Sequence, residues 1–214
     1  MSTAAASTPA PNTSSFRSVV DMWHHRVRST PDAEAMTYKD GADWTTITWR
    51  QAEARVRTLA NGLLHHGLET EQRVCILGTT SVEWILSDLA ILCAGGATTT
   101  IYPSNTPEEC AYIINDCDAV MVFADTQEQV DKLLAVRDQL ANVRKVITVQ
   151  GAPTEDGWVE TLATLEDHGK AHAEAKPDHY DEVTSLFAPE TAATEIYTSG
   201  TTGKPKGVMI THDS

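Results

Sequence analysis

The sequence has 214 residues, of which 41% are hydrophobic and 21% charged, a balance typical of a soluble globular protein. Its net charge of -14 argues against nucleic-acid binding, because contacts with phosphates need a basic surface. No apolar stretch reaches the roughly 18 residues that a membrane span requires. We interpret the best candidate, Trp84–Ala97, as a buried helix running into a strand, because it is short and contains Asp88.

The cysteines and the first residues predict a cytoplasmic protein. We interpret Cys75, Cys93, Cys110 and Cys117 as reduced core residues, since a chain of this length does not depend on disulfides for its core. Residues 1–15 lack the basic start and apolar core of a secretory signal, and they lack the arginines of a transit peptide. Their Ala, Ser, Thr and Pro composition predicts a disordered tail.

The first elements in chain order are a helix, a hairpin and a second helix. The sequence predicts a helix over 16–28, extended segments over 33–38 and 44–49, and a helix over 49–66. Thr48 and Gln51 form a capping-box pattern at the start of that second helix, and Gly67 marks its end.

Strands and helices then alternate. Short apolar runs at 73–78, 97–102, 119–124 and 145–150 predict strands. The intervening helices are expected to end near 94, 116 and 140, and each begins with a capping pattern: Thr80 with Glu83, Thr106 with Pro107 and Glu109, and Thr126 with Gln129. This alternation predicts an α/β fold with a mostly parallel sheet flanked by helices.

The remainder of the chain is less regular. Residues 151–191 are polar, and we predict a long surface connection with one short helix; its acidic residues between 155 and 182 are interpreted as a solvated surface. Strand-like patterns return at 191–197 and 207–212. The histidine pairs His24-His25 and His65-His66 are interpreted as solvated helix surface, because adjacent side chains on a helix diverge.

The segment "IYTSGTTGKPKG", residues 196–207, carries the clearest chemical signal. Its glycines permit a backbone to approach a ligand closely, its hydroxyls can contact phosphate or a metal ion, and its lysines can lower the charge of a polyphosphate. Because it joins two extended runs, it is predicted to span a hairpin or to lie at a sheet edge. A surface turn without a ligand remains the alternative on composition alone.

The spacing excludes a Walker A loop. That loop needs four residues between its first Gly and the Gly-Lys pair, followed by Ser or Thr. Here only Thr201 and Thr202 separate Gly200 from Gly203, and Pro205 follows Lys204. The proline also disfavours a helix that continues from Lys204.

The stretch "YTSGTTGKPKGVMITH" closely resembles the phosphate-loop signature of the adenylate-forming (AMP-binding) enzymes. Residues 16–214 are similar to the amino-terminal part of that family, and most similar to the long-chain fatty acyl-CoA synthetases, whose segment after the second helix of the sheet resembles "TIYPSNTPEE". The resemblance implies the amino-terminal part of the adenylate-forming fold, with residues 1–15 outside it as a tail.

The resemblance also implies roles for individual residues. The expected contacts with the β- and γ-phosphates of ATP are Thr198, Ser199, Gly200, Thr201, Thr202, Gly203 and Lys206. Thr198 is in addition the candidate Mg²⁺ contact, and His212 matches the family's histidine after the second strand. Glu195 departs from the apolar residue usual in the long-chain enzymes, which predicts either reduced burial or an edge position.

The implied reaction converts a fatty acid, ATP and coenzyme A into acyl-CoA through an acyl-adenylate. The family's adenine and ribose contacts, a second Mg²⁺ ligand and a catalytic lysine follow the phosphate loop, so we expect the 214 residues alone to be inactive. The expected partners are small molecules and not nucleic acid, with peripheral membrane contact conceivable only for a longer parent protein. Other adenylating enzymes, such as peptide-synthetase domains or aryl and short-chain ligases, remain alternatives, as does a non-catalytic nucleotide-binding module.

Overall fold

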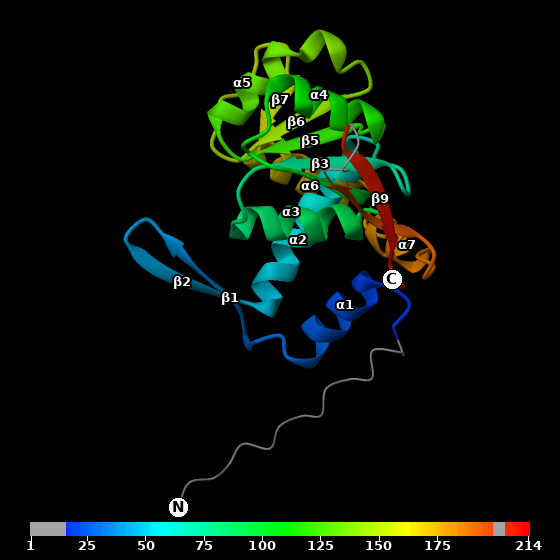
Figure 1. Ribbon diagram of the computed structural model, residues 1–214. Coiled ribbons are helices and arrows are strands. Elements are labelled where there is room, and N and C mark those ends of the chain that lie inside the picture. Colours follow the sequence, from blue (N-terminus) through cyan, green and yellow to red (C-terminus); the bar gives the residue numbers. More distant parts are fainter. Residues whose placement is uncertain (1–15, 199–203) are drawn as a thin grey trace, which may run out of the picture.

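The computed structural model describes residues 16–198 and 204–214. The predicted tail, residues 1–15, and the loop residues Ser199, Gly200, Thr201, Thr202 and Gly203 lie outside the described residues. Figure 1 shows a twisted sheet with helices against both of its faces, and a separate hairpin that extends away from it.

The central sheet has seven described strands in the order β7-β6-β5-β3-β4-β8-β9. All neighbours pair in parallel except β8 and β9, which are antiparallel. The predicted α/β class with a mostly parallel sheet is therefore confirmed. The strand bounds are β3 Arg73–Leu77, β4 Ala97–Ile101, β5 Met121–Ala124, β6 Lys145–Thr148, β7 Val159–Thr161, β8 Ala192–Thr198 and β9 Lys206–Thr211.

The helices cover the sheet because its strands are apolar on both faces. Val74 and Ile76 of β3 pack into one core, whereas Cys75 and Leu77 pack into the other, as the two-residue repeat of a strand requires. Helices α2, α3 and α6 contribute to the first core, and α4 and α5 contribute to the second. The helix bounds are α1 Val19–Ser29, α2 Trp49–His65, α3 Val82–Cys93, α4 Pro107–Asp116, α5 Gln127–Ala135, α6 Leu162–Ala175 and α7 His179–Ser185.

The amino-terminal hairpin stands apart from this sheet. Its strands, β1 Glu34–Asp40 and β2 Asp43–Thr48, pair antiparallel in a two-stranded sheet of their own. Gly41 lies in the turn with a φ of 61°, a conformation that favours glycine. The predicted hairpin is confirmed, and Figure 1 shows it projecting from the body of the molecule.

Two of the four predicted helix starts have the expected cap. Thr48 with Gln51 and Thr106 with Glu109 form complete capping boxes. The Thr80 pattern is wrong, because Ser81 caps α3 by accepting from the Trp84 N–H. Thr126 is the N-cap residue of α5 as predicted, but its side chain makes no cap bond among the described residues. The helix predicted to reach residue 140 ends at Ala135, where a 3₁₀ turn over Arg137–Gln139 follows.

The prediction for residues 151–191 is wrong. This segment contains the edge strand β7 and the helices α6 and α7, and α6 packs against α2. The helices approach so closely that a Cβ at Gly169 would overlap the Thr58 carbonyl of α2. Since glycine lowers helix propensity, the residue that permits this contact also obscured the helix in the sequence.

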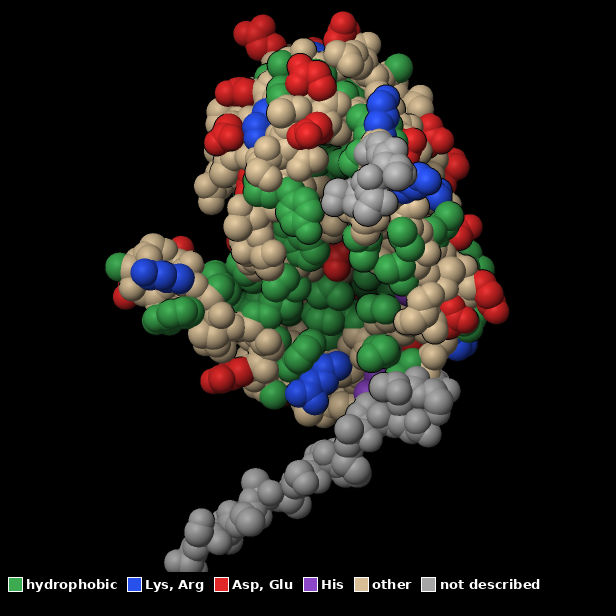
Figure 2. All heavy atoms as spheres, viewed as in Figure 1, with side chains coloured by type: hydrophobic (Ala, Val, Ile, Leu, Met, Phe, Trp, Pro, Cys, Tyr) green, Lys and Arg blue, Asp and Glu red, His purple; other side chains and the backbone are tan. Residues whose placement is uncertain are grey.

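Burial confirms the cysteine interpretation, because all four side chains are buried and free of disulfides. Figure 2 shows hydrophobic side chains gathered in the middle of the viewed face, over α2 and α3. Exposed large apolar residues include Met22, Ile85, Tyr102, Val208 and Met209. Within residues 16–198 and 204–214, no helix combines the length and apolar character that crossing a membrane demands.

Candidate phosphate-binding site

The predicted loop connects two antiparallel strands at one end of the sheet. Thr198 is the last residue of β8 and Lys206 the first of β9, and their Cα atoms are register partners. Both side chains are exposed at this end of the ladder. The predicted hairpin at a sheet edge is thereby confirmed, with β9 as the edge strand among those described.

The parallel strands determine which edge the loop occupies. β8 runs parallel to β4, so its carboxyl end lies at the same edge as the carboxyl ends of β3, β4 and β5. In open α/β sheets, ligands bind outside this edge, where loops rather than helices meet the solvent. Thr198 and Lys206 are brought together there, while five of the seven residues between them, 199–203, lie outside the described part of the chain.

Tyr112 of α4 anchors the returning arm of the loop. Its hydroxyl donates to the Pro205 carbonyl at 2.9 Å, and the Lys204 Nζ lies 4.9 Å from the centre of its ring. The sequence reasoning did not identify this residue. Lys204 is therefore directed toward α4 by a cation–π contact, whereas Lys206 remains on the exposed ladder.

Two surface cavities flank this anchor. One has a volume of about 400 Å³ and the other about 440 Å³, and both are lined by Glu108, Tyr112 and Lys204. Their walls come from α4 and from the arm of the loop. The concave surface of this region thus surrounds the Tyr112–Lys204 contact.

A second tyrosine fixes the other arm. The Tyr197 hydroxyl donates to Asp116 Oδ2 at 2.7 Å, which ties β8 to the end of α4. Burial, together with the hydrogen bond to Asp116, raises the pKa of Tyr197 well above its usual value, so the hydroxyl stays protonated as a donor. Both arms of the loop are consequently attached to the same helix.

The surroundings of Glu195 explain why an acidic residue can stand where the family usually has an apolar one. It lies inside the sheet between Thr99 of β4 and Met209 of β9, so the suggested edge position is wrong. Its carboxylate pairs with the Arg73 guanidinium at 3.4 Å, and its side chain is only 13% exposed. The ion pair compensates for the charge that this strand buries.

Gly207 makes room for the Glu195 carboxylate. A Cβ at position 207 would overlap Glu195 Oε1 and would lie 3.0 Å from Tyr197 Cζ. The glycine is required here by the side chains of the neighbouring strand, because its φ is not among the positive values. The sequence pattern had instead predicted that the glycines of this segment let the backbone approach a ligand.

His212 is placed away from the loop. It follows β9 at the end opposite Lys206, where its Nδ1 accepts a hydrogen bond of 3.3 Å from the Val19 N–H of α1. Burial lowers the pKa of His212, with Asp21 acting weakly in the opposite direction. The His212 side chain therefore connects the end of β9 to α1 and does not lie beside Thr198 or Lys206.

The sequence of this chain matches a known protein family. Residues 23–214 match the model of the family described as AMP-binding enzyme. A long-chain-fatty-acid–CoA ligase of Xenopus laevis is 33% identical over 193 residues, and one of Macaca fascicularis is 34% identical over the same length. Each alignment covers 90% of this chain and 26% of the relative, so the chain spans about a quarter of their length.

Solved structures show the same fold. The anthranilate CoA ligase AuaEII in complex with anthranoyl-AMP superposes with a TM-score of 0.74 at 24% identity, covering 92% of this chain and 35% of that one. A fatty acyl CoA synthetase of Mycobacterium tuberculosis gives a TM-score of 0.71 at 22% identity, covering 91% and 34%. The fold is that of the amino-terminal domain of these proteins.

Proposed function

Because this chain belongs to the AMP-binding enzyme family, we propose that it forms the amino-terminal part of a ligase that activates a long-chain fatty acid with ATP and transfers the acyl group to coenzyme A. The observation that carries the proposal is the pairing of Thr198 with Lys206 at the carboxyl edge of the sheet. The identity to long-chain-fatty-acid–CoA ligases supports the substrate class.

The proposed chemistry has two steps. A carboxylate oxygen of the fatty acid attacks the α-phosphorus of ATP, the bond from that phosphorus to the bridging oxygen breaks, and pyrophosphate leaves. The thiol of coenzyme A then attacks the acyl carbon, loses its proton and displaces AMP. In such a reaction a protein contributes mainly positioning and stabilisation of negative charge.

Lys206 and the loop hydroxyls would bind the pyrophosphate leaving group. We propose that Ser199, Gly200, Thr201, Thr202 and Gly203 contact the β- and γ-phosphates, with Thr198 and Lys206 at the base of the loop. The exposed ammonium of Lys206 could stabilise the charge that develops on pyrophosphate. Lys204 is engaged with Tyr112, which favours a supporting role for it.

Thr198 fits one position in the coordination of Mg²⁺. The ion prefers six oxygen ligands and takes most of them from water and substrate phosphates. The Thr198 side chain is exposed at the base of the loop. Thr198 could thus supply one oxygen, and the bound ion would neutralise phosphate charge.

The test is fatty-acid-dependent exchange of labelled pyrophosphate into ATP, measured on the complete polypeptide that contains these 214 residues. Saturated fatty acids of graded length are compared with acetate and anthranilate. Exchange that is strongest with long chains supports the proposal. Exchange with anthranilate or acetate alone assigns another substrate class, and ATP binding without any exchange favours a non-catalytic nucleotide-binding module.

We also propose a cytoplasmic location, and small-molecule substrates in place of nucleic acid. The free cysteines and the absence of a spanning helix among the described residues are compatible with this location. Peripheral membrane contact is proposed only for the complete polypeptide, since long-chain fatty acids partition into membranes. Fractionation of the complete polypeptide with and without a high-salt wash tests both statements.

A further inference from the structure

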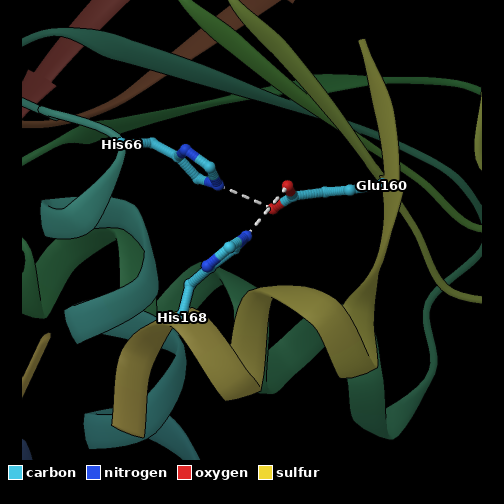
Figure 3. Close-up of side chains that lie close together, drawn as sticks. All are labelled: His66, Glu160 and His168. Atoms are coloured by element: carbon cyan, nitrogen blue, oxygen red, sulfur yellow. Dashed lines mark hydrogen bonds and ion pairs between the residues drawn. The ribbon is translucent and has the colours of Figure 1, made fainter. Parts of the chain in front are cut away.

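Two histidines and a glutamate meet at the edge of the sheet opposite the β8–β9 hairpin. His66 directly follows α2, Glu160 lies in the middle of the edge strand β7, and His168 belongs to α6. Figure 3 shows both imidazole rings directed at the Glu160 carboxylate from different elements. His66 Nε2 lies 2.7 Å from Oε1, and His168 Nε2 lies 3.8 Å from Oε2.

We propose that His66, Glu160 and His168 bind a divalent transition metal ion, with zinc as the best fit. Their donor atoms all lie within 4.8 Å of one another. In a tetrahedral zinc site with bonds of about 2.0–2.1 Å, neighbouring donors are separated by roughly 3.3 Å. The His66 Nε2–Oε1 distance lies below that value and the His168 Nε2–Oε2 distance lies above it. The two distances end on different oxygens of the Glu160 carboxylate, so the side chains must rotate to hold one ion.

The donor set selects the class of metal. Imidazole nitrogens suit zinc, copper and nickel, whereas calcium and magnesium prefer oxygen ligands alone. Three protein ligands leave a fourth tetrahedral position for water. The partial exposure of His168, at 37% of its side chain, gives the ion a path to the site, while Glu160 is only 7% exposed.

The surroundings hold the rings in place. The ring of His65 stacks on that of His168 with centroids 4.6 Å apart and an interplanar angle of 6°. Glu160 is fixed by the backbone of β7, and the close packing of α6 on α2 at Gly169 sets the separation of the two helices. The three donors therefore converge because of tertiary packing, although His66 and Glu160 are 94 positions apart in the sequence.

The positive charge of Lys145 would repel the proposed ion. Replacing this residue therefore distinguishes a metal site from a purely structural cluster. Its Nζ lies 3.7 Å from Glu160 Oε2 and also donates to the Gly157 carbonyl at 2.5 Å. A purely structural cluster would use Lys145 and His66 to balance the carboxylate. In a metal site, the same ammonium repels the ion and weakens its binding.

The experiment is calorimetric titration of the 214-residue chain with Zn²⁺, together with four variants. His168→Ala and Glu160→Gln each remove one ligand, Lys145→Met removes the opposing charge, and His25→Ala is a matched control on α1. Circular dichroism confirms that each variant keeps the fold. His168→Ala is the ligand variant least able to disturb packing, because its side chain is the most exposed of the three.

The proposal requires about one zinc ion per chain, with affinity reduced at least roughly tenfold in His168→Ala and Glu160→Gln. Lys145→Met should bind zinc more tightly than the wild type, and His25→Ala should match it. Binding of Zn²⁺ weaker than about millimolar overturns the proposal. Equal zinc affinity in the wild type and His168→Ala would also overturn it. So would weaker zinc binding in Lys145→Met than in the wild type.

Discussion

Thr198 and Lys206 lie directly opposite each other across the β8–β9 ladder, as the last residue of one strand and the first of the next. Seven residues separate them, yet the ladder fixes the two ends of the loop at the spacing of neighbouring strands. The sheet therefore predefines the base of the loop before any ligand is present. This relationship places a hydroxyl and an ammonium on the same ladder position.

Lys206→Ala in the complete polypeptide should lower fatty-acid-dependent pyrophosphate exchange by roughly a hundredfold, because one cationic donor to the leaving group is lost. The effect should appear in kcat more than in the KM for the fatty acid, which does not contact the loop in the proposal. Steady-state exchange kinetics measure both. Lys39→Ala, on the exposed strand β1, is the control of equal charge change, and equal loss in both variants would remove Lys206 from the site.

Tyr112→Phe should raise the KM for ATP by about fivefold, because the hydrogen bond to the Pro205 carbonyl contributes about 1 kcal/mol to holding the loop arm. The ring and its contact with Lys204 remain, so the fold should be unchanged. Tyr38→Phe, on the hairpin, is the matched control. An unaltered KM for ATP in Tyr112→Phe would show that the anchor does not position the loop for nucleotide.

Sequence patterns predicted the centre of the fold well, for a physical reason. Strands β3, β5 and β6 are buried on both faces, so they appear as short apolar runs, and the capping boxes at Thr48 and Thr106 mark helix starts. Gly67, with a φ of 74°, marks the end of α2 as predicted. Each of these signals depends on residues that are close together in the chain, so a single sequence is enough to detect them.

The missed features depend on contacts between distant residues. Helix α6 packs against α2 through a narrow face that includes Gly169, so its sequence lacks a strong apolar repeat. The interpretation of His66 as solvated helix surface is wrong, because Glu160 of β7 accepts its hydrogen bond. Glu160 is likewise buried, unlike the solvated acidic surface predicted for 155–182. The phosphate loop was identified by its resemblance to a family. Tyr112 could not be identified from the sequence, since it is 93 positions from Pro205, the residue that it contacts.

Gly207→Ala should destabilise the β8–β9 hairpin by about 1–3 kcal/mol, because the added methyl group overlaps Glu195 and crowds Tyr197. Urea unfolding measures the loss. The double variant Gly207→Ala with Glu195→Ala removes the carboxylate that is in the way, so it should recover part of the stability that steric overlap costs. Additive destabilisation in the double variant would contradict this explanation.

Acidification should weaken the contact between His212 and α1. Burial lowers the pKa of His212 in the folded state, so at mildly acidic pH the unfolded chain binds more protons at this residue than the folded chain does. Its contribution is therefore complete above the unfolded pKa of about 6.5 and declines as the pH falls below it. Protonation also removes Nδ1 as acceptor for the Val19 N–H, while Asp21 partly offsets the loss.

His212→Gln should make the free energy of unfolding less dependent on pH between about 7 and 5, measured by urea denaturation at several pH values. His25→Gln is the control, since its side chain bonds only to Ser29 on the same helix among the described residues. A pH profile of His212→Gln that superimposes on the wild type would exclude His212 as the titrating group.

The edge strand β9 should promote self-association of the chain. Val208 is 50% and Met209 56% exposed, and one side of β9 has no strand partner among the described residues. Unpaired backbone groups beside exposed apolar side chains favour edge-to-edge pairing. Val208→Lys adds a charge to the strand, so it should lower the apparent mass at high protein concentration in light scattering. Val19→Lys on α1 adds the same charge to a residue of 36% exposure without altering the edge. If both variants reduce association equally, net charge and not the edge strand controls it.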